Sequence, residues 1–240
     1  GETRIVGKPV SRVDGYERVS GTAVYPSDLV LPGMLYGAMV RSPYPNARVR
    51  GVDTRKASAK PGVRAVITAA DTKAGPNWSY SKDMSEEFFP EQCRYEGEAV
   101  AAVAAESPYQ AREAAKAVTV DYEVLPYLVD ETRALEQGAP QVHSGGNRVK
   151  KDAYERGNVD KGFEAADVVL EQTYVTPCEL HTPLELHGCV AAWDRDRLTI
   201  WESTQGVYAV QSLVAKALGL PLSKVRVIGH YMGGGFGSKL

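Results

Sequence analysis

One strand–helix–strand pattern near the middle of the chain constrains the fold more than any other stretch. The apolar residues 99–105 predict a strand, and Ser107 and Pro108 follow as the N-cap and first residue of a helix. A second strand is predicted at residues 118–124. The apolar side of the helix consists of Ala111, Ala114, Ala115 and Val118. Because alanine is small, we expect this helix to lie close against one sheet that both flanking strands join.

Short extended segments separated by glycine and proline precede this unit. Strands are predicted at residues 22–25, 34–40, 47–52 and 63–68. Residues 42–46 contain two prolines, which remove backbone donors and hold their predecessors extended, so a fixed loop is expected there. Residues 74–92 are rich in Gly, Pro, Asn and Ser and predict a long loop.

A polar stretch without periodicity divides the chain. Residues 130–157 lack an apolar stripe, and we interpret them as the connection between two domains. Beyond them, a short helix is predicted at residues 159–166. The alternation of apolar and polar residues at 168–175 predicts a half-buried strand. A second domain therefore begins here.

The remaining part alternates strands and a helix. The predicted elements are two strands of an antiparallel hairpin, a helix and a final strand, at residues 187–193, 198–201, 205–218 and 225–228. Polar residues 194–197 form the hairpin turn. Ser203 or Thr204 is expected to cap the helix, and Gly219 to end it.

The final strand opens into a glycine-rich loop. Four glycines, at positions 233, 234, 235 and 237, surround Phe236. Glycine tolerates positive φ and lets another group approach the main chain, so the cluster is typical of backbone N–H groups directed at a ligand. The loop lacks the Gly-x-Gly-x-x-Gly and Gly-x-x-x-x-Gly-Lys-Ser/Thr spacings of dinucleotide and P-loop sites. These residues alone leave a ligand loop and a tight structural turn as equal alternatives.

Several motifs in a fixed order surround this loop. His-Thr-Pro-Leu-Glu-Leu-His-Gly-Cys-Val-Ala at 181–191, Trp-Glu-Ser-Thr-Gln at 201–205 and Gly-Gly-Gly-Phe-Gly-Ser-Lys at 233–239 stand in the second half. Arg-Ser-Pro-Tyr-Pro-Asn-Ala at 41–47 and Tyr-Glu-Gly-Glu-Ala-Val at 95–100 stand in the first. Together they resemble the molybdenum hydroxylase family, which includes xanthine dehydrogenase, aldehyde oxidoreductase and carbon monoxide dehydrogenase. The likeness extends over nearly the whole chain.

The resemblance implies an α+β fold and a domain order. Residues 1–135 would form the a/b hammerhead domain of the aldehyde oxidase and xanthine dehydrogenase type, and residues 136–157 the connecting segment. Residues 158–240 would be the beginning of the first molybdopterin-binding domain, which is incomplete here. The chain is accordingly expected to be the amino-terminal portion of a large subunit, as a fragment or as a separately made half.

The resemblance also implies a cofactor, a reaction and partners. The cofactor would be a molybdopterin-type molybdenum cofactor, with the cytosine dinucleotide form as one alternative. The reaction would be hydroxylation of an aldehyde or N-heterocyclic carbon with water-derived oxygen. Electrons would pass to 2Fe-2S and FAD groups on an iron–sulfur subunit and an FAD subunit. The remainder of the large subunit or a second molybdopterin-binding polypeptide would complete the site, in a cytoplasmic dimer of heteromers.

Specific residues follow from the same resemblance. The glutamine of the family's Ser-Thr-Gln motif, here Gln205, approaches an oxygen ligand of molybdenum. The backbone of Gly234, Gly235, Phe236 and Gly237 would face the same region. Without the resemblance, Gln205 is an exposed glutamine at a helix start, and Phe236 wedges a loop against the core. Lys239 is expected to contact solvent or phosphate.

The resemblance further indicates what the chain lacks. The family uses a glutamate general base near the end of a much longer subunit, and the chain stops before that point, so no catalytic residue is expected within it. Leu240 occupies the position where xanthine-oxidising relatives carry a substrate-contacting glutamate. Purine substrates are therefore disfavoured.

Two other kinds of site are disfavoured by the residues themselves. His181 and His187, with Glu179 and Glu185, could suggest zinc, but Pro183 between them prevents the one-turn helical spacing of a His-Glu-x-x-His motif. A hydrogen-bonded, partly buried turn is the default, and no metal ligand is assigned. No nucleophile is supported either, because Ser203 lacks a Gly-x-Ser-x-Gly elbow and Cys178 lacks a basic neighbour.

Composition excludes several partner classes. The net charge is −2 and basic residues are scattered, which argues against nucleic acid and charged membranes. The most apolar run, residues 99–105, is far shorter than the roughly 20 residues of a transmembrane helix. Three scattered cysteines make neither a disulfide framework nor a zinc site and favour a reducing compartment. The chain begins with Gly1, so a removed targeting segment stays an open alternative.

Two rival functions remain from the sequence. In one, the chain is a non-catalytic assembly subunit, with Trp78, Trp193 and Trp201 as interface anchors. In the other, the glycine loop binds a free phosphate or nucleotide. Molybdenum analysis of the purified complex distinguishes the first from a cofactor subunit, and nucleotide binding by the isolated chain tests the second.

Overall fold

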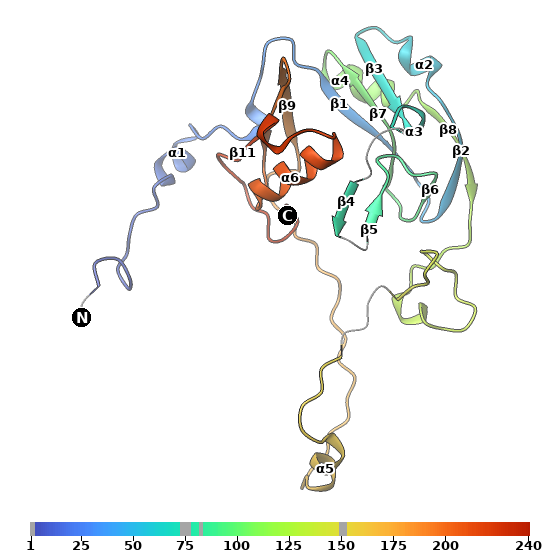
Figure 1. The fold of residues 1–240 in the computed structure, drawn as a ribbon, viewed down its shortest axis with the longest axis vertical. Coiled ribbons are helices and arrows are strands. Elements are labelled where there is room, and N and C mark those ends of the chain that lie inside the picture. The colour runs from blue at the N-terminus through green and yellow to red at the C-terminus, as the bar shows by residue number, and fades with distance from the viewer. Residues whose placement is uncertain (1–2, 73–77, 82–83, 149–152) are drawn as a thin grey trace. The chain divides into compact units, whose positions relative to one another are not determined.

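The computed structural model describes residues 3–72, 78–81, 84–148 and 153–240 (Figure 1). The chain divides into two compact units. Unit 1 consists of Gly1–Leu35, Thr72–Phe88 and His181–Leu240, and unit 2 of Tyr36–Asp71 and Phe89–Leu180. Each unit combines helices with antiparallel or mixed sheets, as expected for an α+β chain.

Unit 2 contains a three-stranded antiparallel sheet in the order β1-β7-β3. Its strands are β1 (Tyr36–Arg41), β7 (Ala99–Ala105) and β3 (Val63–Thr68). Helix α4 (Pro108–Ala115) contacts all three strands. The Ser107 hydroxyl accepts a hydrogen bond from the Gln110 N–H, which confirms the predicted cap. Ala57, Val103, Ala114 and Val118 form the buried core between sheet and helices.

A second sheet of unit 2 has the order β6-β2-β8. Its strands are β2 (Ala47–Asp53), β6 (Gln92–Cys93) and β8 (Thr119–Val124). The expectation that β7 and β8 join one sheet is wrong, because β1 and β3 occupy both edges of β7 while β8 pairs with β2. The proline loop at 42–46 is held as expected: the Ser42 N–H donates to the Glu98 carbonyl and its hydroxyl accepts from the Tyr44 N–H.

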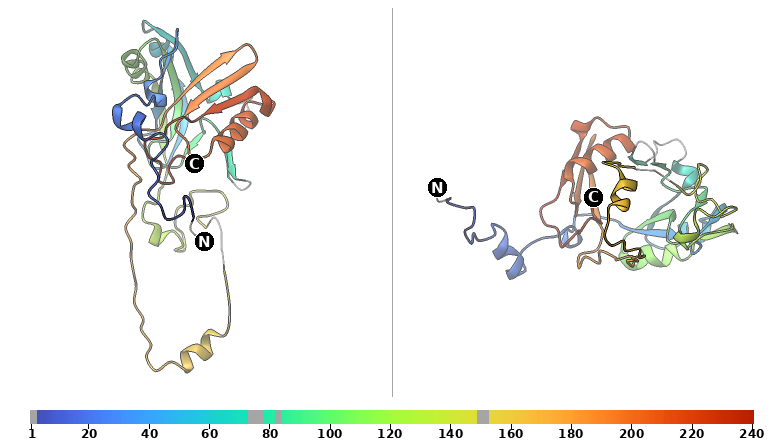
Figure 2. Two further views of the ribbon diagram at one scale, coloured as in Figure 1. Left: turned by 90° about the vertical axis from the view of Figure 1, so that its left-hand side faces the viewer. Right: turned by 90° about the horizontal axis from the view of Figure 1, so that it is seen from below.

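Unit 1 is built around a three-stranded sheet in the order β11-β10-β9. The predicted hairpin is confirmed as β9 (Cys189–Asp194) and β10 (Arg197–Glu202), which pair antiparallel around a tight turn with Arg195 at φ 55°. Strand β11 (Val225–Ile228) runs parallel to β10. Helix α6 (Val207–Ala217) connects them, and its Ala215 packs on Leu198, Ile200 and Val225 in the core. Figure 2 shows the hairpin, α6 and β11 together.

The start of α6 differs from the prediction. Gly206 is the N-cap, and no side chain caps the helix. The Ser203 hydroxyl is instead engaged in the buried cluster, where it donates to the Glu185 carboxylate and accepts from the Lys239 ammonium. The Thr204 hydroxyl accepts from the Gly206 N–H, which tightens the turn before the helix.

Two predicted strands are absent from the described residues. Residues 22–25 form coil before the short helix η1 (Pro26–Asp28), and residues 168–175 run extended without a pairing partner (Figure 2). Alternation favours a strand only where a neighbouring strand supplies hydrogen bonds, and neither segment has one. The large apolar side chains of 168–175 are correspondingly exposed.

The remaining elements are short. They are α1 (Gly15–Ser20), α2 (Arg55–Ser58), α3 (Ala69–Thr72), η2 (Glu131–Arg133), α5 (Val159–Glu164) and η3 (Leu222–Lys224). In the segment predicted as one long loop, β4 (Trp78–Ser81) pairs with β5 (Met84–Glu86), so that prediction is wrong for these residues. Its residues 74–77 and 82–83 lie outside the described part. Within the described residues, no helix combines the length and apolarity that a membrane crossing requires.

Candidate cofactor site

The glycine turn after β11 folds back onto the segment between β10 and α6. The Gly237 N–H donates a 2.8 Å hydrogen bond to the side-chain oxygen of Gln205. The Gln205 N–H and the Thr204 hydroxyl both donate to the Lys239 carbonyl, at 2.6 and 3.2 Å. The parallel pairing of β10 and β11 explains this meeting, because parallel neighbours end at the same edge of a sheet.

Close contact between Gln205 and the turn requires glycine at one position. A Cβ atom added to Gly235 would lie 2.5 Å from the Gln205 side-chain oxygen and 2.8 Å from its amide carbon. The flanking Gly234 and Gly237 have φ values of 97° and 96°, which side-chain-bearing residues rarely adopt. The four-glycine pattern therefore serves both turn geometry and close approach.

The exposed side of the turn carries unused hydrogen-bond donors. Phe236 is 73% exposed and has φ 54°, so its ring does not wedge the loop against the core. In the part of the chain that the structure describes, the Phe236 N–H makes no hydrogen bond. The same holds for the side-chain NH₂ of exposed Gln205, whose amide oxygen is already engaged by Gly237. The arrangement presents N–H groups to an acceptor.

A buried charged cluster lies beneath the turn. The Lys239 ammonium donates to the Glu185 carboxylate at 3.0 Å, to the Glu185 carbonyl at 2.9 Å and to the Ser203 hydroxyl at 3.0 Å. Lys239 is only 4% exposed, so the expectation that it contacts solvent or phosphate is wrong. Its ammonium is stabilised by three acceptors, which offset the loss of water around a buried charge.

Glu185 connects this cluster to the first glycine of the turn. Its Oε2 accepts hydrogen bonds from the Gly233 N–H and from the Ser203 hydroxyl. Burial raises the pKa of the Glu185 carboxyl, but the bonds from Ser203, Gly233 and Lys239 outweigh it and the net shift is downward. A Cβ on Gly233 would lie 2.5 Å from the Glu185 Cβ, so this position also requires glycine.

The two histidines near Glu185 do not take part in the cluster. His181 and His187 are both exposed, whereas Glu185 is partly buried and hydrogen-bonded, as was expected of this segment. Throughout the described ranges, no group of three or more His, Cys, Asp or Glu side chains gathers as a metal site would require.

A second support of the turn comes from the amino-terminal segment and was missed by sequence reasoning. Arg18 donates to the Met232 carbonyl at 3.2 Å and to the Tyr25 hydroxyl at 3.1 Å. Its guanidinium lies 5.3 Å from the Tyr231 ring centroid. A cavity of about 430 Å³ beside these residues is lined by Tyr25, Trp201, His230 and Tyr231, among others. No local pattern around Arg18 indicates this long-range contact.

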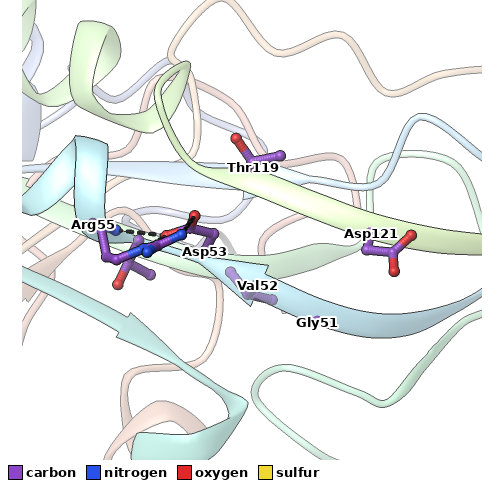
Figure 3. A pocket seen from close by; sticks show the side chains of 7 residues that line it. Gly51, Val52, Asp53, Arg55, Thr119 and Asp121 are labelled. Carbon is purple, nitrogen blue, oxygen red and sulfur yellow. Dashed lines mark hydrogen bonds and ion pairs between the residues drawn. The ribbon is translucent and has the colours of Figure 1, made fainter.

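Unit 2 contains a larger but open cavity of about 540 Å³ (Figure 3). Its lining includes Asp53 and Arg55, whose side chains pair with each other at 2.7 Å. Hydrogen bonds from Arg55 hold the pKa of the Asp53 carboxyl below its usual range. The Asp53 and Arg55 side chains therefore satisfy one another.

Two family models match consecutive parts of the chain. Residues 20–126 match the model described as "Aldehyde oxidase and xanthine dehydrogenase, a/b hammerhead domain". Residues 142–240 match the model described as "Molybdopterin cofactor-binding domain". The chain belongs to the molybdenum hydroxylase family. The predicted fold class, a hammerhead domain followed by molybdopterin-binding sequence, is thereby confirmed.

The curated relatives include components of xanthine and nicotinate dehydrogenases. The chain is 37% identical over 238 residues to a probable xanthine dehydrogenase component of Bacillus subtilis, covering 98% of this chain and 32% of that protein. It is also 37% identical over 241 residues to the nicotinate dehydrogenase large molybdopterin subunit of Eubacterium barkeri, covering 99% of this chain and 56% of that protein. The chain thus spans about a third to a half of these relatives.

Solved structures agree with this assignment. Quinoline 2-oxidoreductase from Pseudomonas putida 86 matches with a TM-score of 0.90 and 29% identity, over 99% of this chain and 32% of that one. Reconstituted CO dehydrogenase from Oligotropha carboxidovorans matches with a TM-score of 0.86 and 34% identity, over 98% of this chain and 32% of that one. A molybdopterin cofactor is therefore the group that this family's domain binds.

Proposed function

We propose that this chain forms part of the cofactor-binding subunit of a molybdenum hydroxylase, with Gln205, Gly234, Gly235, Phe236 and Gly237 holding one side of the molybdenum cofactor. The observation that carries the proposal is the paired set of unused donors, the Gln205 side-chain NH₂ and the Phe236 N–H, on one exposed turn. Both can donate to an acceptor atom without breaking an existing bond.

The residues fit a molybdenum cofactor in chemistry as well as in position. The Gln205 side-chain NH₂ and the Phe236 N–H are donors, which suits a cofactor rich in oxygen acceptors. Fixed N–H groups also need no reorganisation when negative charge develops near them, which is the usual protein contribution to this kind of chemistry. Gly235 keeps the turn in contact with Gln205, because any side chain there would displace the amide.

The cofactor would supply a two-electron oxidation in which a substrate carbon gains an oxygen from water and two protons are released. The chain's own residues bind and orient. The substrate we propose is an aldehyde or an N-heterocyclic compound, in line with the names of the quinoline and nicotinate enzymes that it resembles. Leu240, where a glutamate would favour purines, argues against xanthine, although xanthine dehydrogenase components are among its relatives.

An exposed apolar segment supports the proposed partners. Val168, Leu170, Tyr174 and Val175 are all more than three-quarters exposed, although their alternation is that of a half-buried strand. We propose that the remainder of the large subunit, or a second molybdopterin-binding polypeptide, covers this segment. An iron–sulfur subunit and an FAD subunit would accept the electrons, within a cytoplasmic dimer of heteromers.

Two finer points belong to the same proposal. The cofactor would be a molybdopterin form, with the cytosine dinucleotide as one alternative. The hammerhead domain would extend over residues 1–135, the connection over 136–157 and the molybdopterin-binding part over 158–240.

The test is molybdenum content per purified complex for wild type, Gln205→Ala and a control, Gln137→Ala. Gln137 is an exposed glutamine far along the chain from the turn. We expect molybdenum in the wild type and the control, and a loss of molybdenum or of hydroxylase activity, by about tenfold or more, in Gln205→Ala. Wild-type complex free of molybdenum would overturn the proposal.

A non-catalytic assembly role is the second candidate. Trp193 is 56% exposed on β9, and a large exposed aromatic residue is a common interface anchor. In that case Trp193→Ala would dissociate the complex, while the molybdenum content would depend on another polypeptide alone and would be unchanged in Gln205→Ala.

A further inference from the structure

We infer that Glu185 and Lys239 are positioning residues that set the direction of the Gln205 amide through the glycine turn. The inference rests on the proposed function, since it concerns the donors that Gln205 presents to the cofactor. Neither residue faces the exposed side of the turn, because the Lys239 side chain is fully buried and the Glu185 side chain is 10% exposed.

The buried pair fixes the two ends of the turn at once. At the first end, Gly233 donates its N–H to the Glu185 carboxylate at 2.6 Å, and the Glu185 N–H donates to the Gly233 carbonyl at 3.3 Å. At the other end, the Lys239 ammonium binds the same carboxylate at 3.0 Å. One carboxylate oxygen therefore holds the turn closed at both Gly233 and Lys239.

The backbone carbonyl of Lys239 links the buried pair to Gln205. While its ammonium is held by Glu185 and Ser203, its carbonyl accepts hydrogen bonds from the Gln205 N–H and the Thr204 hydroxyl. A shift of Lys239 would thus move the backbone of Gln205 as well. No other residue of the described chain bonds with its side chain to Glu185 and with its carbonyl to Gln205.

The orientation of the amide depends on the closed turn. With Gly237 held near Gln205, the side-chain oxygen accepts the Gly237 N–H, and the NH₂ group is left to face outward. If the turn relaxed, that bond would weaken and the amide could rotate about its last side-chain torsion, which is broad for glutamine. An amide turned the other way would present an acceptor where a donor is needed.

The experiment compares Glu185→Gln, Lys239→Met and Ser203→Ala with the control Lys224→Met in the purified complex. Glu185→Gln keeps the side-chain shape and removes the charge. Ser203→Ala is the milder change, since it removes one acceptor of the ammonium and keeps both charges. Lys224 forms an ion pair with exposed Asp196 in the same unit, so its variant controls for the loss of a lysine charge.

Three quantities are measured: molybdenum per complex, turnover per molybdenum with its KM, and hydrogen exchange of residues 229–240. For Glu185→Gln we expect exchange of that segment to rise by about tenfold or more. Turnover per molybdenum should fall by about tenfold with KM nearly unchanged, because the lost donor acts in the reaction and not in substrate binding. The Mo(V) electron paramagnetic resonance signal should shift, Ser203→Ala should change each quantity less, and Lys224→Met should match wild type.

The inference and the proposed function fail in different ways. If turnover per molybdenum and the Mo(V) signal stay at wild-type values in Glu185→Gln and Ser203→Ala while exchange rises, the pair only stabilises the fold and the inference is wrong. If Lys239→Met or Glu185→Gln does not fold, Ser203→Ala still decides between these outcomes. If the wild-type complex holds no molybdenum, the proposed function itself is wrong and the inference falls with it.

Discussion

The side-chain oxygen of Gln205 accepts a 2.8 Å hydrogen bond from the main-chain N–H of Gly237, 32 residues further along the chain. This one bond decides which end of the amide faces outward. It is possible because β10 and β11 are parallel neighbours, so the residues that follow each strand emerge together. The site therefore depends on backbone geometry at least as much as on side-chain identity.

Gly235→Ala is expected to open this contact. The added Cβ would lie 2.5 Å from the Gln205 oxygen, so the turn or the amide must shift. Because the exposed Gln205 side chain can move aside, we expect a loss of less than about 1 kcal/mol in the free energy of unfolding, but a clear fall in molybdenum content. Thermal unfolding and elemental analysis measure the two. The control is Gly188→Ala in the same unit, where the new Cβ meets no atom within 4 Å; an equal effect there would contradict the prediction.

Ser107→Ala is expected to weaken α4 and with it unit 2. The hydroxyl accepts the Gln110 N–H at the helix start, and loss of such a cap typically costs about 1 kcal/mol. Urea unfolding of the variant should show this loss, and Ser107→Asp should restore most of it. Thr54 at the start of α2 makes no side-chain cap bond, so Thr54→Ala should cost clearly less. Equal losses for the two alanine variants would refute the capping argument.

The Glu185 carboxylate should make stability depend on acid pH. Its pKa is lowered in the folded protein, because the hydrogen bonds from Ser203, Gly233 and Lys239 outweigh the opposing effect of burial. The stabilisation is therefore complete above the unfolded pKa of about 4.3 and is lost as pH falls through the lower folded value. Urea unfolding from pH 7 to pH 3 should show a smaller fall for Glu185→Gln than for wild type. Parallel curves would show that Glu185 does not contribute.

Arg18→Met is expected to loosen the approach to the glycine turn. The variant keeps much of the apolar side-chain volume but loses the bonds to the Met232 carbonyl and the Tyr25 hydroxyl and the contact with the Tyr231 ring. We expect faster hydrogen exchange at residues 230–234 and a stability loss of about 1 kcal/mol.

Arg12→Met is the matched control for Arg18. Arg12 also pairs with Asp14, but its side chain is largely exposed and makes no bond to the turn. Its removal should leave exchange at residues 230–234 unchanged. If both variants changed exchange equally, the effect would come from Asp14 and not from the link to Met232.

Much of the local structure could be predicted from the sequence because its signals are local. The strand at 99–105, the Ser107 cap and the hairpin around residues 194–197 depend on neighbours within a few positions, and all three are confirmed. Residues 22–25 and 168–175 carry strand-like patterns too. They are not strands, because a strand also requires a neighbouring strand to pair with, and a segment's own sequence does not specify that partner.

The same division applies to the site. By itself, the sequence determined that a glycine-rich turn follows a strand and that its motifs resemble molybdenum hydroxylases. Only the tertiary structure decided that Lys239 is buried against Glu185 and that Arg18 reaches the Met232 carbonyl. A glycine-rich pattern indicates a local backbone conformation, which depends on adjacent residues. A buried ion pair or a long-range hydrogen bond depends on which distant segments the sheet brings together, and that is a property of the whole fold.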